Sequence, residues 1–326
     1  MHLRWVADKE ENMNKSKNLL KGNAIWLVFI AMVIIFTVTS GGNFIKPSNI
    51  VNIARQVAVY GIASIGMTCV ILIGGIDLST GSIITFVNII CAYMMVNMGM
   101  NMWVAILISV IAATLIGVLN GFMVSTIGIP AIIATFASQT IFEGLAYIIS
   151  NGMPISGFDK AFNLFGKNSV GPVPVSAIIM IACFIVGALL LNKTYFGRYF
   201  YAIGGNEDAA ELSGIRVSRT KYLIYAISGF FAGLAGIVML SRTGSAQNTA
   251  GLGYEFDVIT CVVLGGVSVN GGVGKISGVI AGVLIIGSLT NGMILMDVNS
   301  YTQSVVKGLV LAIAVGIDCM SKKKKH

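Results

Sequence analysis

Long hydrophobic runs separated by short polar stretches occupy almost the whole chain from residue 24 onwards. A helix needs about 20 consecutive apolar residues to cross the hydrocarbon core of a bilayer, and ten runs come close to that length. They fall at about 24–40, 50–73, 79–97, 102–124, 129–150, 174–192, 221–241, 256–273, 276–296 and 302–319. The pattern predicts an all-α polytopic membrane protein with about ten transmembrane helices. Glycines near the ends of 50–73 and 256–273 leave open a bent or re-entrant course for these two runs.

The composition agrees with this fold class. Of the 326 residues, 56% are hydrophobic and only 10% are charged, and the mean hydropathy is +0.87. Soluble domains carry a charged fraction of about 25%. Because the length is taken up by spans and short loops, no sizeable soluble domain is expected.

Basic residues gather in three places, and these set the expected orientation. They are Arg4, Lys9, Lys15, Lys17 and Lys21 in the leader, Lys193, Arg198, Arg216, Arg219 and Lys221 after the sixth run, and Lys322 to Lys325 in the tail. Short cytoplasmic segments of membrane proteins are rich in Lys and Arg, so both termini are expected in the cytoplasm and 151–173 outside. The net charge of +8 is therefore explained by basic residues in cytoplasmic segments, and no nucleic-acid partner is expected.

This orientation divides the chain into three parts. A cytoplasmic leader spans 1–23, a transmembrane domain spans 24–319 and a basic cytoplasmic tail spans 320–326. The transmembrane domain includes a cytoplasmic loop at 193–220, with six helices before it and four after it.

The two halves of the chain share similar short segments. TCVILIGGI at 68–76 resembles TCVVLGGV at 260–267, and IGVLNGFMV at 116–124 resembles IGSLTNGMIL at 286–295. The matches predict an internal repeat, parallel or inverted, with chance similarity between apolar segments as the alternative. In many transporters the path lies where two repeats meet.

Several reaction classes lack the residues that they need. The five cysteines lie in apolar runs without CxxC spacing, which favours buried thiols over disulfides or metal ligands. The histidines, His2 and His326, are terminal, so no catalytic histidine and no metal site is expected in the membrane. GGVSVNGGVGKIS at 265–277 fails as a phosphate loop, because Val269 and Ile276 stand where Gly and Ser or Thr are required. It is expected to be a tight cytoplasmic turn.

Polar residues inside the spans are the remaining candidates, because charge is costly in lipid. Glu143 is the clearest, and Gln139 lies one turn earlier on the same helical face. This pair is expected to line a cavity or to pack between helices, since no partner charge for a proton relay is evident.

Other polar residues have more ordinary interpretations. Asp77 and Asp297 lie near expected span ends, where solvation or capping explains them. Asn88, Asn120 and Asn291 lie within spans, where amides bridge helices more often than they contact a ligand.

The polar stretch GGNEDAAELSGIRVSR at 204–219 separates two hydrophobic blocks. Asn206 is a favourable N-cap, the acidic Glu207 suits the first helical turn, and Gly214 suits the position just past a helix. The stretch predicts a short cytoplasmic helix at about 207–213. On these features alone it could lie on lipid or contact another protein.

Four segments carry a resemblance to a known family. They are GGIDLSTGS at 74–82, AIGGNEDAAELSGIRV at 202–217, AQNTAGLGYEFDVITCVVLGG at 246–266 and NSYTQSVVKGLVLAIAV at 299–315. In this order they resemble segments of the ribose and simple-sugar permease family, the membrane subunits of ATP-binding cassette (ABC) importers. The resemblance runs from about residue 24 to 318.

The resemblance implies an assembly and a location. Two permease subunits, identical or paralogous, would pair in the bacterial cytoplasmic (inner) membrane. An ABC ATPase with two nucleotide-binding domains would dock on the cytoplasmic side, and an extracytoplasmic sugar-binding protein would deliver the substrate. The chain would then be a transport subunit and not an enzyme. It would bind no cofactor itself, because ATP and Mg²⁺ belong to the partner ATPase.

The resemblance also implies functional residues. In the family, a segment of the GGNE-x-AA-x-x-SGI type is the coupling helix that docks on the ATPase. Carried onto this chain, that role falls on Gly205, Asn206, Glu207, Ala209, Ala210, Ser213, Gly214 and Ile215. The sugar pathway is expected along Asn120, Gln139, Glu143 and Asn291.

Two other classes of function remain as alternatives. A proton- or sodium-coupled transporter of a small polar solute would use Glu143 as its sole deep carboxylate, although no second buried charge is evident to couple with it. An intramembrane enzyme would need a nucleophile with a base or a metal cluster, and the carboxylates are isolated.

Overall fold

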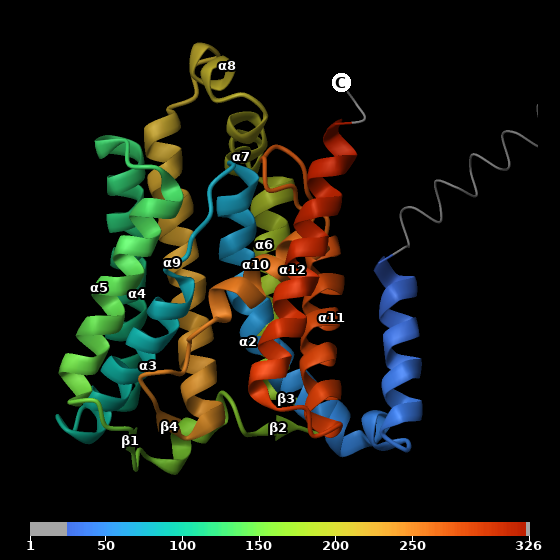
Figure 1. Ribbon diagram of the computed structural model, residues 1–326. Helices are drawn as coiled ribbons and strands as arrows, with labels where there is room; N and C mark the ends of the chain where they lie inside the picture. Colours follow the sequence, from blue (N-terminus) through green and yellow to red (C-terminus); the bar gives the residue numbers. More distant parts are fainter. Residues whose placement is uncertain (1–24, 324–326) are drawn as a thin grey trace, which may run out of the picture.

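The computed structural model describes residues 25–323, and their side chains as far as 320. The expected leader at 1–23 and the end of the tail at 324–326 lie outside this description. Within it, helices form most of the chain (Figure 1). They are Ile25–Thr39, α2 (Pro47–Leu72), α3 (Thr80–Val96), α4 (Met102–Phe122), α5 (Ala131–Ser150), α6 (Val175–Lys193), α7 (Tyr195–Gly205), α8 (Glu207–Leu212), α9 (Val217–Thr243), α10 (Tyr254–Leu264), α11 (Ile276–Leu295) and α12 (Ser300–Lys323).

Shorter elements connect these helices. They are the 3₁₀ turns Asn43–Ile45 and Lys160–Leu164, a π-helical turn Met123–Ile127 that extends α4, and four two-residue strands. The antiparallel strand pairs are β1 (Ile155–Ser156) with β4 (Ser245–Ala246), and β2 (Ser169–Val170) with β3 (Val173–Pro174).

Seven of the described helices are long and apolar enough to cross a membrane, namely α2, α4 with its π-helical extension, α5, α6, α9, α11 and α12. The N-terminal helix and α3 are shorter, and α10 has only 11 residues, or about 16 Å of rise. The run at 50–73 lies within the continuous α2, whereas the run at 256–273 breaks after Leu264 into a non-helical loop. The all-α polytopic class is confirmed, and the number of ten crossings stays a prediction.

Two segments enter the bundle as non-helical chain followed by a short helix. After α2, residues 73–79 lead back to the start of α3, and after α9, residues 244–253 lead to the start of α10 (Figure 1). The second stretch contacts α3, because the Gly251 amide donates to Thr85 Oγ1 at 2.9 Å. Irregular backbone is tolerated at membrane depth where it is buried in protein, and such broken helices surround the binding sites of many transporters.

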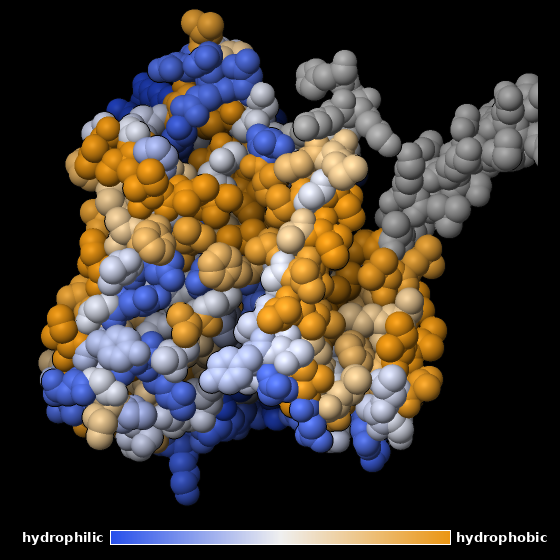
Figure 2. All heavy atoms as spheres, viewed as in Figure 1, coloured by the Kyte–Doolittle hydropathy of each residue, from blue (hydrophilic) through white to orange (hydrophobic). Residues whose placement is uncertain are grey.

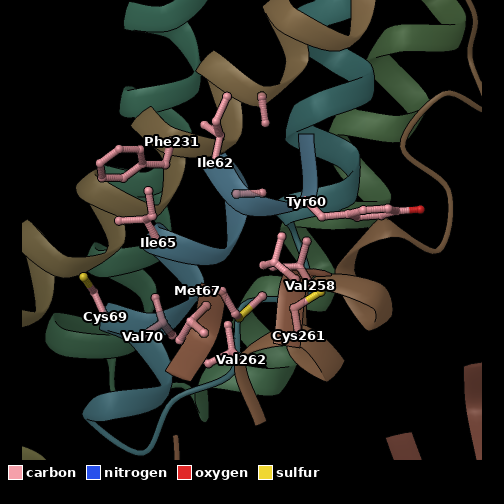
Figure 3. Close-up of a cluster of buried hydrophobic side chains, with 14 of the residues drawn as sticks. Tyr60, Ile62, Ile65, Met67, Cys69, Val70, Phe231, Val258, Cys261 and Val262 are labelled. Carbon is pink, nitrogen blue, oxygen red and sulfur yellow. The ribbon is translucent and has the colours of Figure 1, made fainter. Parts of the chain in front are cut away.

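Helix α2 forms the centre of the bundle, and every residue from Val57 to Leu72 is buried. Figure 3 shows its side chains packed beside Phe231 of α9 and Val258 of α10. Gly66 allows α9 to approach closely, because a Cβ atom there would lie 2.7 Å from the Ser228 Cα. Small residues at such crossings let membrane helices pack backbone to backbone.

The periphery of the bundle is apolar. Large hydrophobic side chains are exposed on α4, α5, α6 and α12, and they form much of the surface in Figure 2. This is the surface that lipid or another membrane subunit would cover. The buried free thiols expected from the sequence are found for Cys69, Cys91, Cys183 and Cys261, whereas Cys319 is exposed on α12.

The molecule has two different ends, which we call the α8 end and the strand end (Figure 1). Helix α8 and the C-terminal end of α12 lie at the α8 end. The segment 151–173 and all four strands lie at the strand end. The loop at 193–220 and the end of α12 are therefore on the same side, as the charge pattern predicts.

The similar sequence segments do not form one structural repeat. The first pair lies at the C-terminal ends of α2 and α10, and Figure 3 shows these two helices running in the same sense. The second pair lies in α4, which runs toward the α8 end, and in α11, which runs away from it (Figure 1). A parallel or an inverted repeat would relate both pairs in the same way. These two matches therefore do not belong to one repeat, and the internal repeat itself stays a prediction.

Candidate functional site

Helix α8 is a short capped helix, as its sequence predicts. The Asn206 side chain accepts a hydrogen bond from the Ala209 amide at 2.9 Å, and the Ser213 hydroxyl donates to the Ala209 carbonyl at 2.7 Å. Gly214 follows with φ +86°, a left-handed conformation that favours glycine. The helix ends at Leu212, one residue before the predicted end.

One face of α8 fixes it to the bundle. Ala210 is buried against Ile203 of α7 and Val217 of α9, and Glu207 forms an ion pair with Lys221 at 2.6 Å. The rest of the helix is open, and the Leu212 side chain is 90% exposed. The element therefore projects from the α8 end with a fixed orientation and a free outer surface (Figure 1).

The glycine-rich loop before α11 packs tightly beneath this region. Tyr201 donates its hydroxyl hydrogen to the Gly274 carbonyl at 2.9 Å, and the Gly272 amide donates to the Leu72 carbonyl at 2.8 Å. Gly204 fits between Leu72 and Gly272 with no space for a Cβ atom. The loop is a tight turn, as expected, and it joins α7 to the end of α2.

A second cluster of functional candidates lies inside the bundle, where α3, α5 and α10 meet. The Gln139 side-chain amide donates to Glu143 Oε1 at 3.1 Å and to Glu255 Oε1 at 3.5 Å. Glu255 stands at the start of α10 and is only 2% exposed. Its second oxygen, Oε2, has no hydrogen-bond partner and lies against Gly81 of α3.

Next to this cluster, a buried ion pair joins α10 to α12. Lys307 Nζ lies 2.7 Å from Asp257 Oδ2, and both side chains are largely buried. Lys307 also lies 6.0 Å from the ring centre of Tyr60, which stacks on Tyr254 at 4.9 Å. Acids, amide, lysine and two aromatic rings thus lie together at the start of α10.

Sequence reasoning missed most of this cluster. Glu143 was expected to be the sole deep carboxylate without a partner charge, and this is wrong because Glu255 shares the Gln139 amide with it and Asp257 forms a buried ion pair with Lys307. Asp257 falls inside the run at 256–273, where the hydrophobic average conceals it. A signal existed in the motif YEFD, which places two acids at the start of an apolar helix.

The other predicted pathway residues lie elsewhere. Asn120 is buried in α4 and donates to Ser79 Oγ at 2.8 Å. Asn291 of α11 exchanges two hydrogen bonds with Asn49 of α2, at 2.9 and 3.0 Å. Asn88, an amide that was not assigned to the pathway, donates to the Gly236 carbonyl of α9 at 3.0 Å. The structure groups Gln139 with Glu143, whereas each of these amides joins separate parts of the bundle.

The two aspartates at expected span ends differ. Asp77 is fully buried and accepts hydrogen bonds from the Ser79 amide at 3.0 Å and the Ser228 hydroxyl at 2.7 Å. Solvation does not explain it, but the local capping bond was expected. Asp297 is exposed at the end of α11 with φ 54°. Its position fits the ordinary interpretation of a helix end.

Comparison with known proteins shows the family of this chain. A model described as the permease component of the branched-chain amino acid transport system matches residues 49–315. The chain belongs to this permease family. The ribose import permease RbsC of Bacillus subtilis is 45% identical over 89% of this chain and 90% of its own length.

Two further relatives agree with this membership. The RbsC protein of Haemophilus influenzae is 42% identical over 91% of this permease, and the L-arabinose transport permease AraH of Escherichia coli is 38% identical over 92%. No solved structure matches the permease significantly. The resemblance to ABC importer permeases is confirmed. The chain is a multi-pass membrane subunit of such an importer in the bacterial inner membrane.

Proposed function

We propose that this permease forms the translocation pathway for a pentose in an ABC importer. The observation that carries the proposal is that the relatives named for ribose and arabinose align over about nine tenths of both chains. A relative named for xylose, XylH of Haemophilus influenzae, is 31% identical over 95% of this chain. All three sugars are pentoses, whereas the family description names branched-chain amino acids.

The proposed orientation places the α8 end in the cytoplasm. Lys193, Arg198, Arg216, Arg219 and Lys221 lie in or next to the loop at this end, as cytoplasmic segments require. Counting α3 and α10 with the non-helical chain before them as two broken spans gives ten crossings, with both termini inside.

The proposed energy source is an ATPase that docks on α8. The helix projects from the molecule with a free outer surface, and small residues of the coupling segment such as Gly205 permit close approach of a partner. ATP binding would move α8, and the permease would alternate between outward-open and inward-open states. In this proposal ATP and Mg²⁺ bind the ATPase, a binding protein delivers the sugar at the strand end, and a second permease subunit completes the pathway.

The direct test is uptake by the reconstituted importer. The permease, its ATPase and its binding protein are placed in proteoliposomes, and uptake of labelled D-ribose, L-arabinose and D-xylose is measured with ATP on the α8 side. We expect uptake of one pentose that requires ATP and the binding protein and that stops with vanadate. Uptake of leucine in place of every pentose would contradict the proposal.

A coupled secondary transporter is the second candidate, and the grouping of Glu143 with Glu255 is the observation that favours it. Buried carboxylates of this kind carry protons in many transporters. The same vesicles decide between the two. The ABC mechanism requires uptake to continue in the presence of an uncoupler, and secondary transport requires it to continue without ATP.

A further inference from the structure

The cluster around Glu255 has more hydrogen-bond acceptors than donors. Glu143 and Glu255 bring four carboxylate oxygens, whereas Gln139 brings a single amide group that both acids share. One oxygen of Glu255 has no partner although the side chain is only 2% exposed. Buried polar groups in native proteins are almost always paired, so an unpaired carboxylate oxygen indicates a missing donor.

The position of this oxygen suits a ligand better than a structural partner. Oε2 of Glu255 lies against Gly81, at the place where the starts of α3 and α10 meet. The neighbouring ion pair does not supply the donor, because Lys307 donates to Asp257 and makes no hydrogen bond with Glu255 Oε2. A donor must therefore come from outside the described residues.

Polar side chains of intermediate burial lie beside this position. Gln139 and Glu143 are half-buried, and the Gln139 amide joins Glu143 to Glu255. Figure 2 shows hydrophilic side chains between α5 and α12, beneath a hydrophobic area. Polar surface at the depth of the spans points to a water-accessible path.

The charge of the cluster limits the ligand class. Two carboxylates repel an anionic group, and the Asp257–Lys307 pair adds no net charge. A net anionic ligand would thus be rejected, whereas a neutral polyol offers several hydroxyl donors. Hydrogen bonds from hydroxyls to a carboxylate are short and strong.

We infer that Glu255, with Gln139 and Glu143, forms an intramembrane site that binds the hydroxyl groups of a neutral sugar during its passage. The inference rests on the proposed function and deepens it. Selection then occurs twice, once in the binding protein and once in the permease. The second selection separates neutral sugars from anionic solutes.

The test measures how much sugar is transported for each ATP hydrolysed. Glu255→Gln keeps the shape of the side chain and removes the charge, and Gln139→Ala removes the shared amide from a half-buried position. In the reconstituted importer, we expect Glu255→Gln to lower the ratio of labelled pentose to ATP at least about tenfold, while the binding protein still stimulates the ATPase. Gln139→Ala should lower the ratio less. Asp297→Asn, an exposed acid at the strand end, is the matched control and should keep the wild-type ratio.

Each outcome decides the inference. A wild-type ratio in Glu255→Gln overturns it, and so does a proportional fall of uptake and ATPase, since a purely structural role reduces both. If Glu255→Gln does not assemble, Gln139→Ala decides, and failure of both variants to assemble would show a structural role. A requirement for Na⁺ or protons that disappears in Glu255→Gln would assign the carboxylate to a cation instead. Absence of pentose uptake in the wild-type importer would refute the proposed function itself.

Discussion

Two of the buried aspartates inside the bundle are compensated locally. Asp77 is held by an amide and a hydroxyl, and Asp257 is held by Lys307. The cost of burying each charge is offset by these partners, so removal of one partner exposes the full desolvation penalty of the other. The ion pair also connects α12 to α10, beside α12 side chains such as Val310 and Leu311 that pack against the core.

This arrangement predicts the effect of removing the lysine. Lys307→Met leaves Asp257 charged and unpaired, and we expect a loss of about 3–5 kcal/mol in stability. The double variant Asp257→Asn with Lys307→Met removes both charges and should recover part of the loss. Thermal unfolding of the purified permease in detergent measures both. Equal melting temperatures for the wild type and Lys307→Met would show that the pair is not buried in the assembled protein.

The residues that sequence analysis identified correctly act through local rules. Asn206 and Gly214 cap α8 because capping depends on neighbouring backbone groups only. Glu255 and Lys307 were not identified because their meaning depends on which helices lie side by side. That information is absent from the order of residues along one helix.

At the scale of elements, α8 combines a fixed base with a free surface. Its six residues cannot form a stable helix alone, so its caps and its packing against α7 and α9 hold it in place. A rigid projecting element can transmit a push from a docked partner, whereas a flexible loop would absorb it.

Two substitutions test the docking role. Glu207→Lys turns the ion pair between residues 207 and 221 into a repulsion between two positive charges. Gly214→Val places a β-branched residue at positive φ. We expect both to lower the binding-protein-stimulated ATPase of the assembled importer severalfold while the permease still inserts in the membrane. Glu211→Gln, on the same helix but outside the coupling segment's matched residues, is the control. Wild-type stimulation in both variants would contradict the docking assignment.

The sequence predicted full-length spans better than broken ones. Long apolar runs such as α4 and α11 appear close to their predicted bounds, since hydrophobic length alone defines them. Helix α10 was merged with the glycine-rich loop behind it, because both are apolar. Apolar residues continue past Leu264, so no polar boundary marks the end of this helix.

At the scale of the whole molecule, orientation in the membrane is the property that connects all the proposals. It assigns the ATPase to one end and the sugar-binding protein to the other. The basic residues near α8 support it, although Lys160 and Lys167 lie at the strand end as well. The predicted orientation therefore also depends on the basic residues of the leader and the tail.

Thiol labelling in intact cells tests this orientation. Lys160→Cys and Arg216→Cys are made separately with Cys319→Ser, because the other four thiols are buried. A membrane-impermeant maleimide added outside should label the cysteine at 160, but label the one at 216 only after permeabilisation. The reverse pattern would show that the α8 end lies outside the cell, where α8 could not dock on a cytoplasmic ATPase.

The contact at Gly204 has a mechanical consequence. Here the backbones of α7, of the end of α2 and of the loop before α11 touch with no side chain between them. Side-chain layers can yield by changing rotamers, but backbone in direct contact cannot be compressed. A displacement of α7 would therefore reach α2 almost undiminished, and the central helix of the bundle would begin to move in the same instant as the surface.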